Sequence, residues 1–309
     1  MERYSSNFIA NYIISCAIHN PNGEVIVYGD RRLTWSRIND RANRLAQALI
    51  ERGVLKDDKV LLMFHNCPEF FEVNYAIQKC GAIPVPMNYR FTPPEIEFQA
   101  DHSDAIAFVL EDIWLPAVQK ARPNLKKIKH YICAGPECPS DMVSYENIMV
   151  EYPSLEPHVP TTEDDVCVIC YTGGTTGFPK GVMLTYGAHL KMFTEVIVSM
   201  VARLAEVSLS TTQLTRLKES MSTPGASTIV SLMNTSFVRW LLKRKLTSEL
   251  LRRRAKRLLR DLKMLRKGYE NNNRIMFPSF PLFHDASYPL TIQGAILGNQ
   301  TFISPEGVR

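Results

Sequence analysis

The stretch KVLLMFHNCPEFFEVNYAIQKCGAIPVPMN, residues 59–88, joins three apolar segments of different length and period. Its first part, KVLLMFH, is short and β-rich, which is typical of a buried strand. The next part, PEFFEVNYAIQKCG, predicts an amphipathic helix that Gly81 closes. AIPVPMN then predicts a second short strand. The stretch is therefore predicted to form one strand–helix–strand unit.

The segments on either side of this unit continue the alternation. LTWSRINDRANRLAQALIERG, residues 33–53, predicts a helix with Gly53 at its C-cap. The apolar stripe of this helix would consist of Ile38, Ala42, Leu45, Ala46 and Leu49. AIAFVLED, from Ala105, predicts a further strand. Units of this length imply a parallel sheet with crossover helices, so the predicted fold class is α/β.

The bulk composition is that of a globular enzyme. The chain has 309 residues, of which 45% are hydrophobic, enough for a substantial core in one large or two modest domains. Its seven cysteines are scattered and mostly embedded in apolar runs. This pattern favours reduced, buried thiols in a cytosolic protein over a disulfide framework.

The first apolar stretch, FIANYIISCAI from Phe8, is interrupted by Asn11 and has neither a basic n-region nor a small-residue cleavage site. We interpret it as an amphipathic opening helix. No uninterrupted apolar run reaches the roughly 20 residues that span a bilayer. The sequence therefore predicts a cytoplasmic protein, and contact with a membrane surface stays open.

The net charge of +5 is unevenly distributed. Residues 239–267 contain 13 Lys and Arg against two acids, a local charge of +11, which leaves −6 for the rest of the chain. A long basic helix is predicted over residues 235–270, with leucines at helical spacing. Such a helix binds an anionic membrane surface, or it packs its leucines on the main domain or on a partner. No nucleic-acid partner is expected, because interleaved aromatics and a recognisable module are missing.

Residues 171–181, YTGGTTGFPKG, have the composition of a phosphate-binding loop. The Walker template GxxxxGK[ST] does not fit, because Phe178 and Pro179 separate Lys180 from Gly177. Glycines still let backbone amides approach an anion, threonines add hydroxyl donors, and the lysine adds charge. The candidate ATP phosphate-binding residues are Thr172, Gly173, Gly174, Thr175, Thr176, Gly177 and Lys180.

A strand before this loop and a helix after it would place the anion near a helix N-terminus, worth about 0.3–1 kcal/mol. The alternative is a flexible glycine-rich surface turn.

The loop closely resembles the signature loop of adenylate-forming enzymes, which include acyl-CoA synthetases, luciferase relatives and adenylation domains of peptide synthetases. The usual form is [ST]-S-G-T-T-G-x-P-K-G, and Gly173 stands where serine is common. Residues 33–98 also resemble the amino-terminal part of acyl-CoA synthetases. PSFPLFHDAS, from Pro278, is similar to a following family motif near the acyl pocket. The resemblance covers about residues 30–205 and 275–305, in the family's order.

This resemblance implies a two-step reaction. A carboxylate, expected to be a fatty acid, attacks the α-phosphate of ATP, and coenzyme A then displaces AMP from the acyl-adenylate. ATP, Mg²⁺ and coenzyme A are the implied cofactors and co-substrates, and the loop would hold the β- and γ-phosphates. His284 of the PLFH motif would orient the carboxylate or gate the acyl tunnel; the alternative is a histidine satisfied by local hydrogen bonds.

Later motifs of the family are not found before Arg309, among them the glutamate that serves Mg²⁺, the ribose-binding aspartate and the lysine of the C-terminal domain. We therefore expect an N-terminal portion of the adenylate-forming fold with the C-terminal domain absent. Its expected parts are an α/β part at 1–205, a basic helical segment at 206–274 and the start of an acyl-pocket subdomain at 275–309. The alternative function is an inactive remnant that binds a membrane or a partner.

Two smaller motifs allow two interpretations each. Cys167-x-x-Cys170 resembles a redox or zinc half-site, but it lies in a predicted strand, where positions three apart point to opposite faces, which favours core packing. Asn88 and Arg90 in PMNYR match a family phrase and either contact substrate or support the fold. No HExxH, paired zinc ligands or nucleophile elbow is present, so no metal-binding residue is predicted.

Overall fold

A computed structural model of the chain describes residues 8–172, 179–206, 245–260, 275–276, 282 and 300–303. The chain divides into two compact units. One contains Met1–Tyr186 together with Ile275–Arg309, and the other contains Gly187–Arg274. The three-part division expected from the sequence, at 1–205, 206–274 and 275–309, stays a prediction.

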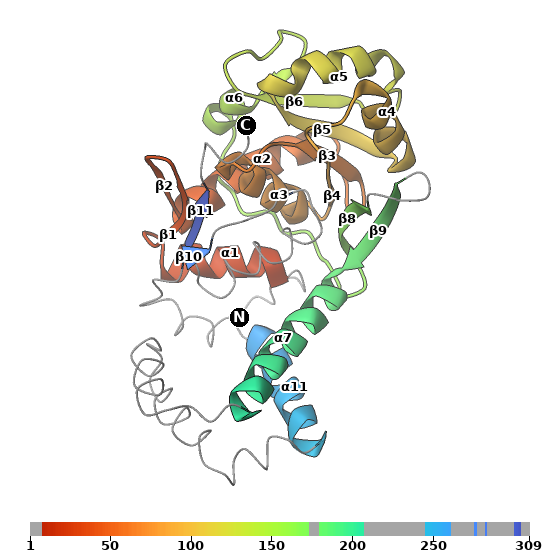
Figure 1. The fold of residues 1–309 in the computed structure, drawn as a ribbon. Helices are drawn as coiled ribbons and strands as arrows, with labels where there is room; N and C mark the ends of the chain where they lie inside the picture. Colours follow the sequence, from red (N-terminus) through yellow and green to blue (C-terminus); the bar gives the residue numbers. More distant parts are fainter. Residues whose placement is uncertain are drawn as a thin grey trace. The chain divides into compact units, whose positions relative to one another are not determined.

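The first unit is built around a parallel sheet of five strands in the order β4-β3-β5-β6-β7 (Figure 1). The strands are β3 (Lys59–Met63), β4 (Ile83–Pro86), β5 (Ala105–Glu111), β6 (His130–Ala134) and β7 (Val143–Ser144). Every neighbouring pair in this sheet is parallel. The prediction of an α/β fold with a parallel sheet is therefore confirmed.

Helices connect or flank these strands and cover both faces of the sheet. They are α2 (Trp35–Glu51), α3 (Pro68–Lys79), α4 (Pro93–His102), α5 (Leu115–Ala121) and α6 (Tyr145–Glu151), with 3-10 turns at Asp112–Trp114 and Arg122–Asn124. The chain runs from β3 outward to β4 and then crosses back past β3 to reach β5. Because such crossovers are right-handed, this reversal places α3 and α4 on opposite faces. In Figure 1, α2 and α3 lie on one side of the sheet and α4 and α5 on the other.

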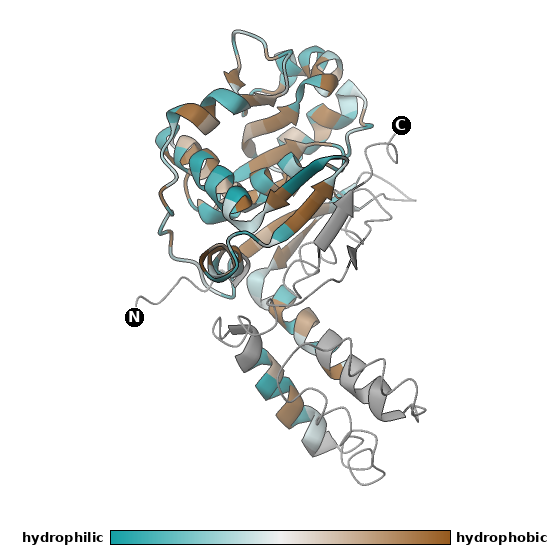
Figure 2. Ribbon diagram, turned by 90° about the vertical axis from the view of Figure 1, so that its left-hand side faces the viewer, coloured by the Kyte–Doolittle hydropathy of each residue, from teal (hydrophilic) through white to brown (hydrophobic). Residues whose placement is uncertain are grey.

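The strands of this sheet are apolar on both faces, as the brown colour along them in Figure 2 indicates. Leu61 and Met63 belong to the buried cluster that α4 and α5 complete. Val60 and Leu62, which alternate with them and point to the other face, are also buried. The sheet therefore forms the centre of the core, with helices excluding water from each side.

The remaining described elements of this unit form two smaller sheets and an opening helix. They are α1 (Phe8–His19), β1 (Glu24–Tyr28), β2 (Arg31–Thr34), β8 (Val166–Thr172), β9 (Lys180–Thr185), β10 (Ile275–Met276) and β11 (Gln300–Ile303). β1 pairs antiparallel with β2 and parallel with β11. The opening helix expected from Phe8 onward is confirmed.

Two glycines predicted to terminate helices are also confirmed: Gly53 follows α2, and Gly81 follows α3. Both have positive φ, +82° and +73°, which residues with a Cβ rarely adopt. In each case the glycine amide donates to the carbonyl three residues back, and the next amide donates to the carbonyl five residues back. These bonds satisfy the last carbonyls of the helix and turn the chain into the following segment.

Helix α3 differs from the amphipathic helix that the sequence predicts, because every residue except Glu69 is buried. α1 and α2 pack on it, and Gln78 Nε2 donates to the carbonyl of Cys167 in β8 at 3.1 Å. Lys79 is paired with Glu156 and also donates to Asn39 Oδ1 at 2.9 Å. The polar residues of α3 therefore face partners in the interior, and the sequence pattern alone does not distinguish these positions from a solvent-facing stripe.

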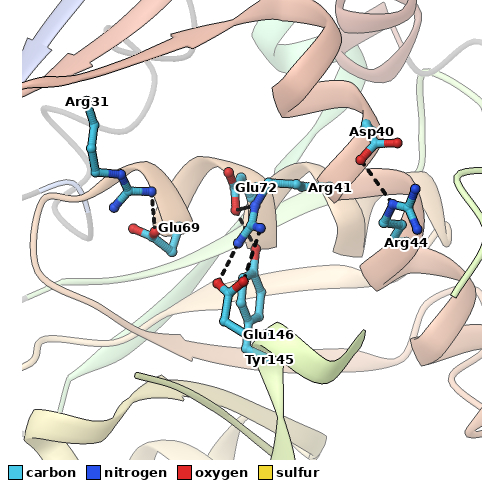
Figure 3. A network of polar contacts seen from close by, with 8 residues as sticks. All are labelled: Arg31, Asp40, Arg41, Arg44, Glu69, Glu72, Tyr145 and Glu146. Atoms are coloured by element: carbon cyan, nitrogen blue, oxygen red, sulfur yellow. Dashed lines mark hydrogen bonds and ion pairs between the residues drawn. The ribbon is translucent and has the colours of Figure 1, made fainter. Parts of the chain in front are cut away.

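A buried ion pair joins three of these helices (Figure 3). Arg41 of α2 donates through Nε to Glu72 Oε2 of α3 at 2.8 Å, and the Tyr145 hydroxyl of α6 donates to the same oxygen at 2.6 Å. Arg41 also contacts Glu146, at 2.8 Å from Nη2. Burial raises the pKa of Glu72 despite the opposing charge of Arg41. Arg41 is therefore the group that offsets a carboxylate fully removed from water.

The second unit contains α7 (Tyr186–Glu206), apart from its first residue, and α11 (Lys245–Arg260). Arg252 forms a two-pronged pair with Glu195 of α7, at 2.7 and 3.2 Å, and Ala255 is buried. These contacts join α11 to α7 within the second unit, while Leu250 is exposed. Packing of the leucines on the main domain or on a partner stays a prediction, and the flanks of the basic helix predicted over residues 235–270 lie outside the described residues. Among the described helices, none has the length and apolar character that crossing a membrane requires.

We expect Arg41→Ala to lower the free energy of unfolding by about 3–5 kcal/mol, because it leaves the buried Glu72 without its cation. Urea unfolding followed by far-UV circular dichroism measures this loss. Arg37→Ala is the matched control, because Arg37 lies exposed on the same helix and should change stability by at most about 0.5 kcal/mol.

The loss in Arg41→Ala should also depend on pH. A raised folded-state pKa means that the folded chain holds the Glu72 proton more tightly than the unfolded chain, whose carboxyl titrates near 4.5. The destabilisation should therefore be largest at pH about 8 and shrink as the pH falls toward about 5. An equal loss at both pH values would mean that the charge on Glu72 is not its cause.

Candidate phosphate-binding site

The candidate phosphate loop lies at the tip of a two-stranded antiparallel hairpin formed by β8 and β9. Thr172, the last residue of β8, is paired in register with Lys180, the first residue of β9. The Thr172 hydroxyl donates to the Lys180 carbonyl at 3.4 Å. These two predicted site residues are therefore brought together at the base of the loop, and the Lys180 side chain is exposed. The predicted residues between them, Gly173 to Gly177, lie outside the described residues.

The helix expected after the loop is present as α7, but the expectation that its N-terminus lies beside the loop is wrong. Residues 180–185 form the strand β9, and α7 begins only at Tyr186. Strand pairing with β8 takes up this segment because KGVMLT carries β-branched and apolar residues that fit a pleated pair. The N-terminus of α7 therefore does not adjoin the loop, and the helix-dipole contribution predicted for the anion does not apply.

The hairpin is held against α4 by a contact that the sequence did not predict. His102 Nδ1, at the end of α4, lies 2.8 Å from the Tyr171 hydroxyl, and their rings meet edge to face. Burial, with the nearby charge of Asp104, raises the pKa of Tyr171 to about 12, so its hydroxyl stays protonated. The sequence alone does not predict this contact, because the two residues are 69 positions apart.

Close packing in the hairpin explains why a glycine, Gly181, follows Lys180. A Cβ at this position would lie 3.0 Å from Ile169 Cγ2 and 3.2 Å from the Tyr171 ring. The hairpin therefore packs so closely here that a side chain at position 181 would displace Ile169 or the Tyr171 ring. Beside it, a cavity of about 210 Å³ is lined mainly by apolar residues of α4 and the hairpin. Its lining residues are Phe91, Pro94, Glu95, Phe98, Gln99, Tyr171 and Pro179.

His284, which was predicted to lie in the acyl-substrate region, is outside the described residues. Leu282 of the same PLFH motif is described, and its side chain is buried. Its backbone N–H donates to Asn66 Oδ1 at 2.7 Å. Leu282 is thus bound to the loop that follows β3, more than two hundred positions earlier in the chain.

The two smaller motifs have structural roles. Cys167 and Cys170 are both buried in β8, and burial raises the pKa of the Cys167 thiol well above its usual range. The prediction that these two cysteines pack in the core, and do not form a redox or zinc half-site, is therefore confirmed. Asn88 Oδ1 accepts from the Arg90 backbone N–H at 3.0 Å, and the Arg90 guanidinium lies over the Tyr89 ring. These contacts favour the fold-supporting interpretation of PMNYR.

The sequence model of the AMP-binding enzyme family matches residues 16–217, which is more than half of the chain. The chain belongs to the AMP-binding enzyme family. This match covers the sheet, its crossover helices and the glycine-rich hairpin loop described above, and it confirms the resemblance to adenylate-forming enzymes.

Acyl-CoA ligases are among the relatives of this AMP-binding enzyme. It is 35% identical over 167 residues to a medium/long-chain-fatty-acid–CoA/3-oxocholest-4-en-26-oate–CoA ligase of Mycobacterium tuberculosis, covering 53% of this chain and 30% of the relative. It is 31% identical over 182 residues to 4-hydroxybutyrate–CoA ligase 2 of Metallosphaera sedula, covering 56% and 33%. The chain thus spans about a third of the length of these curated relatives.

Solved structures show the same fold. The N-terminal domain of FACL13 from Mycobacterium tuberculosis aligns with a TM-score of 0.64 at 22% identity, covering 96% of this chain and 57% of that one. The anthranilate CoA ligase AuaEII, in complex with anthranoyl-AMP, aligns with a TM-score of 0.56 at 24% identity, covering 60% and 36%. At these identities the likeness establishes the fold of the AMP-binding enzyme and no finer property.

We expect Gly181→Ala to destabilise the protein by about 1–3 kcal/mol, because the new methyl must displace Ile169 or the Tyr171 ring. Thermal and urea unfolding measure the loss. The adjacent Val182→Thr is the control: Val182 is partly exposed and its β-branched shape is kept, so the change should stay within about 0.5 kcal/mol. Equal effects of the two substitutions would contradict the close packing at Gly181.

Proposed function

We propose that this AMP-binding enzyme is an ATP-dependent acyl-CoA synthetase, which adenylates a carboxylate and then transfers the acyl group to coenzyme A. The observation that carries the proposal is the loop YTGGTTGFPKG at the tip of the β8–β9 hairpin, with Lys180 exposed at its base. Relatives that are acyl-CoA ligases support the reaction class. A fatty acid is the proposed acid, because the Mycobacterium tuberculosis relative is a medium/long-chain-fatty-acid–CoA ligase.

In this proposal the loop binds the β- and γ-phosphates of ATP. Lys180 supplies a positive charge, Thr172, Thr175 and Thr176 supply hydroxyl donors, and the glycines let backbone amides approach the phosphates. An exposed lysine at the mouth of a hairpin loop fits a polyanion, because its charge needs no burial before the ligand arrives. Mg²⁺, when bound, neutralises phosphate charge.

Catalysis of the adenylation step then rests on positioning and charge. The carboxylate oxygen attacks the α-phosphate, and the bond to pyrophosphate breaks while Lys180 and the loop amides bind the negative charge that leaves. We place His284 near the carboxylate, where it orients the acid or gates its entry. Leu282, two positions before His284, is held by the hydrogen bond from its backbone N–H to Asn66 Oδ1.

The alternative function, an inactive module that binds a membrane or a partner through residues 239–267, has less support. Arg252 is already paired with Glu195 inside the second unit, and Arg253 lies 3.3 Å from Glu249. These pairs leave less of the helix charge to attract an anionic surface. Membrane contact stays a prediction.

Lys180→Ala tests the proposed function directly. Removing a charged hydrogen-bond donor should weaken binding of Mg-ATP about 10- to 100-fold, the equivalent of about 1.5–3 kcal/mol. Calorimetric titration with Mg-ATP measures binding, and formation of labelled acyl-AMP from a fatty-acid mixture measures chemistry. Lys126→Ala is the control, because Lys126 is an exposed lysine outside the loop.

The assignment of the loop is wrong if Lys180→Ala binds Mg-ATP as tightly as the parent chain. If the parent chain and Lys126→Ala bind Mg-ATP more tightly than Lys180→Ala does, but neither of them forms acyl-AMP, the phosphate site stands and the synthetase activity of this chain does not.

A further inference from the structure

The five-stranded sheet has a point, between β3 and β5, where its strand order reverses. The chain leaves β3 toward β4 on one side, and β5, β6 and β7 follow on the other side. The carboxyl ends of β3 and β5 therefore part from each other with their connections leaving in opposite directions. In open α/β sheets ligands bind in the crevice that such a reversal creates.

Three metal-ligating side chains meet at this reversal. His65 and Cys67 follow β3, and Glu111 ends β5. One ligand atom from each of them lies within 4.8 Å of the others. Cys67 is also the N-cap residue of α3, where the positive end of the helix favours a thiolate. Two adjacent strands thus bring a nitrogen, a sulfur and an oxygen ligand to one point.

The contacts around His65 already resemble the outer shell of a metal site. Its Nε2 lies 2.9 Å from the Tyr28 hydroxyl, a partner that fixes the ring and leaves Nδ1 directed toward Glu111. Both the His65 backbone N–H and Nδ1 contact the same oxygen, Glu111 Oε2, at 2.7 and 2.6 Å. The carboxylate is thereby held in place beside the imidazole. In metal sites a histidine ligand is held in this way through its other ring nitrogen.

The three residues open into a cavity of about 710 Å³. Its wall also carries Glu69, Asp112 and Glu146, against a single arginine, Arg31. Arg31 pairs with Glu69 at 2.7 Å, and Glu146 pairs with Arg41 (Figure 3). The balance of charge in the cavity is therefore negative, which favours a cation over an anion.

We propose that His65, Cys67 and Glu111 bind a divalent transition-metal ion such as Zn²⁺, with the fourth position open to the cavity. A nitrogen, thiolate and carboxylate set suits Zn²⁺ or Co²⁺, whereas Mg²⁺ prefers oxygen ligands alone. Thr172 and Lys180, the described residues of the proposed ATP site, do not line this cavity.

Binding exchanges a proton for the metal without any change of oxidation state. The Cys67 Sγ–H bond breaks, an Sγ–metal bond forms, and the proton passes to solvent. Burial and the neighbouring charges of Glu111 and Glu69 raise the pKa of this thiol, so it stays protonated until a metal ion replaces the proton. The proton that lies between His65 Nδ1 and Glu111 Oε2 moves to His65 Nε2, which then donates to the Tyr28 hydroxyl, and the freed Nδ1 lone pair faces the metal.

Titration of the whole chain, reduced and stripped of metal with a chelator, with Co²⁺ tests the proposal. A near-ultraviolet thiolate-to-cobalt charge-transfer band should rise to one equivalent per chain, and Zn²⁺ should abolish it while excess Mg²⁺ should not. Cys67→Ser should lose the band. Tyr28→Phe should keep it with affinity lowered about 10- to 100-fold.

Cys138→Ser is the matched control, because Cys138 lines the same cavity outside the cluster. Its band should equal that of the parent chain. If Cys67→Ser unfolds, as circular dichroism would show, Glu111→Gln replaces it and should weaken Co²⁺ binding by more than about 100-fold, beyond the loss of an outer-shell partner. The proposal is overturned if the parent chain gives no charge-transfer band, if Cys138→Ser removes it, or if Mg²⁺ displaces the ion.

Discussion

Strand β3 is the element on which the rest of the first unit depends. It pairs in parallel with β4 on one edge and with β5 on the other, and its side chains are buried on both faces. Parallel neighbours cannot be joined by a tight turn, so the connections from β3 to β4 and from β4 to β5 cross over the sheet, through α3 and α4. Because the chain continues on both sides of β3, helices must cover both faces, and the ends of β3 and β5 must form a crevice. The layers and the proposed metal site both follow from this position.

Full burial of α3 is a consequence of the same arrangement. The helix lies between the sheet and other elements, so the polar residues in its sequence must find partners inside the protein. Glu72 meets Arg41 and Tyr145, Lys79 meets Glu156, and Gln78 reaches β8. A buried pair of this kind adds little net stability over apolar packing, yet it penalises any docking of α2 and α6 that separates the charges. Arg41 thereby helps to fix how these helices sit on α3.

Local patterns in the sequence predict most of this fold, and features that need distant residues are missed. Strand β3, helix α3 and the glycine at its end are visible because a short apolar run and a glycine determine each of them locally. β9 was missed because KGVMLT becomes a strand only by pairing with β8. The His65, Cys67 and Glu111 cluster was missed for a related reason: two of its members lie two positions apart, and the third lies 46 residues away from His65. Only the order of the strands in the sheet brings β5 next to β3.

The hairpin changes how phosphate binding by the loop must be understood. In a strand–loop–helix arrangement the helix N-terminus would supply amides and a dipole to the anion. Here the segment after the loop is β9, whose amides point sideways into the ladder with β8, and the dipole of an antiparallel pair nearly cancels. The attraction for phosphate then has to come from the loop amides and from Lys180. In the proposed phosphate site, the hairpin register, which sets Lys180 opposite Thr172 at the base of the loop, would take the place of a helix dipole as the source of positive charge.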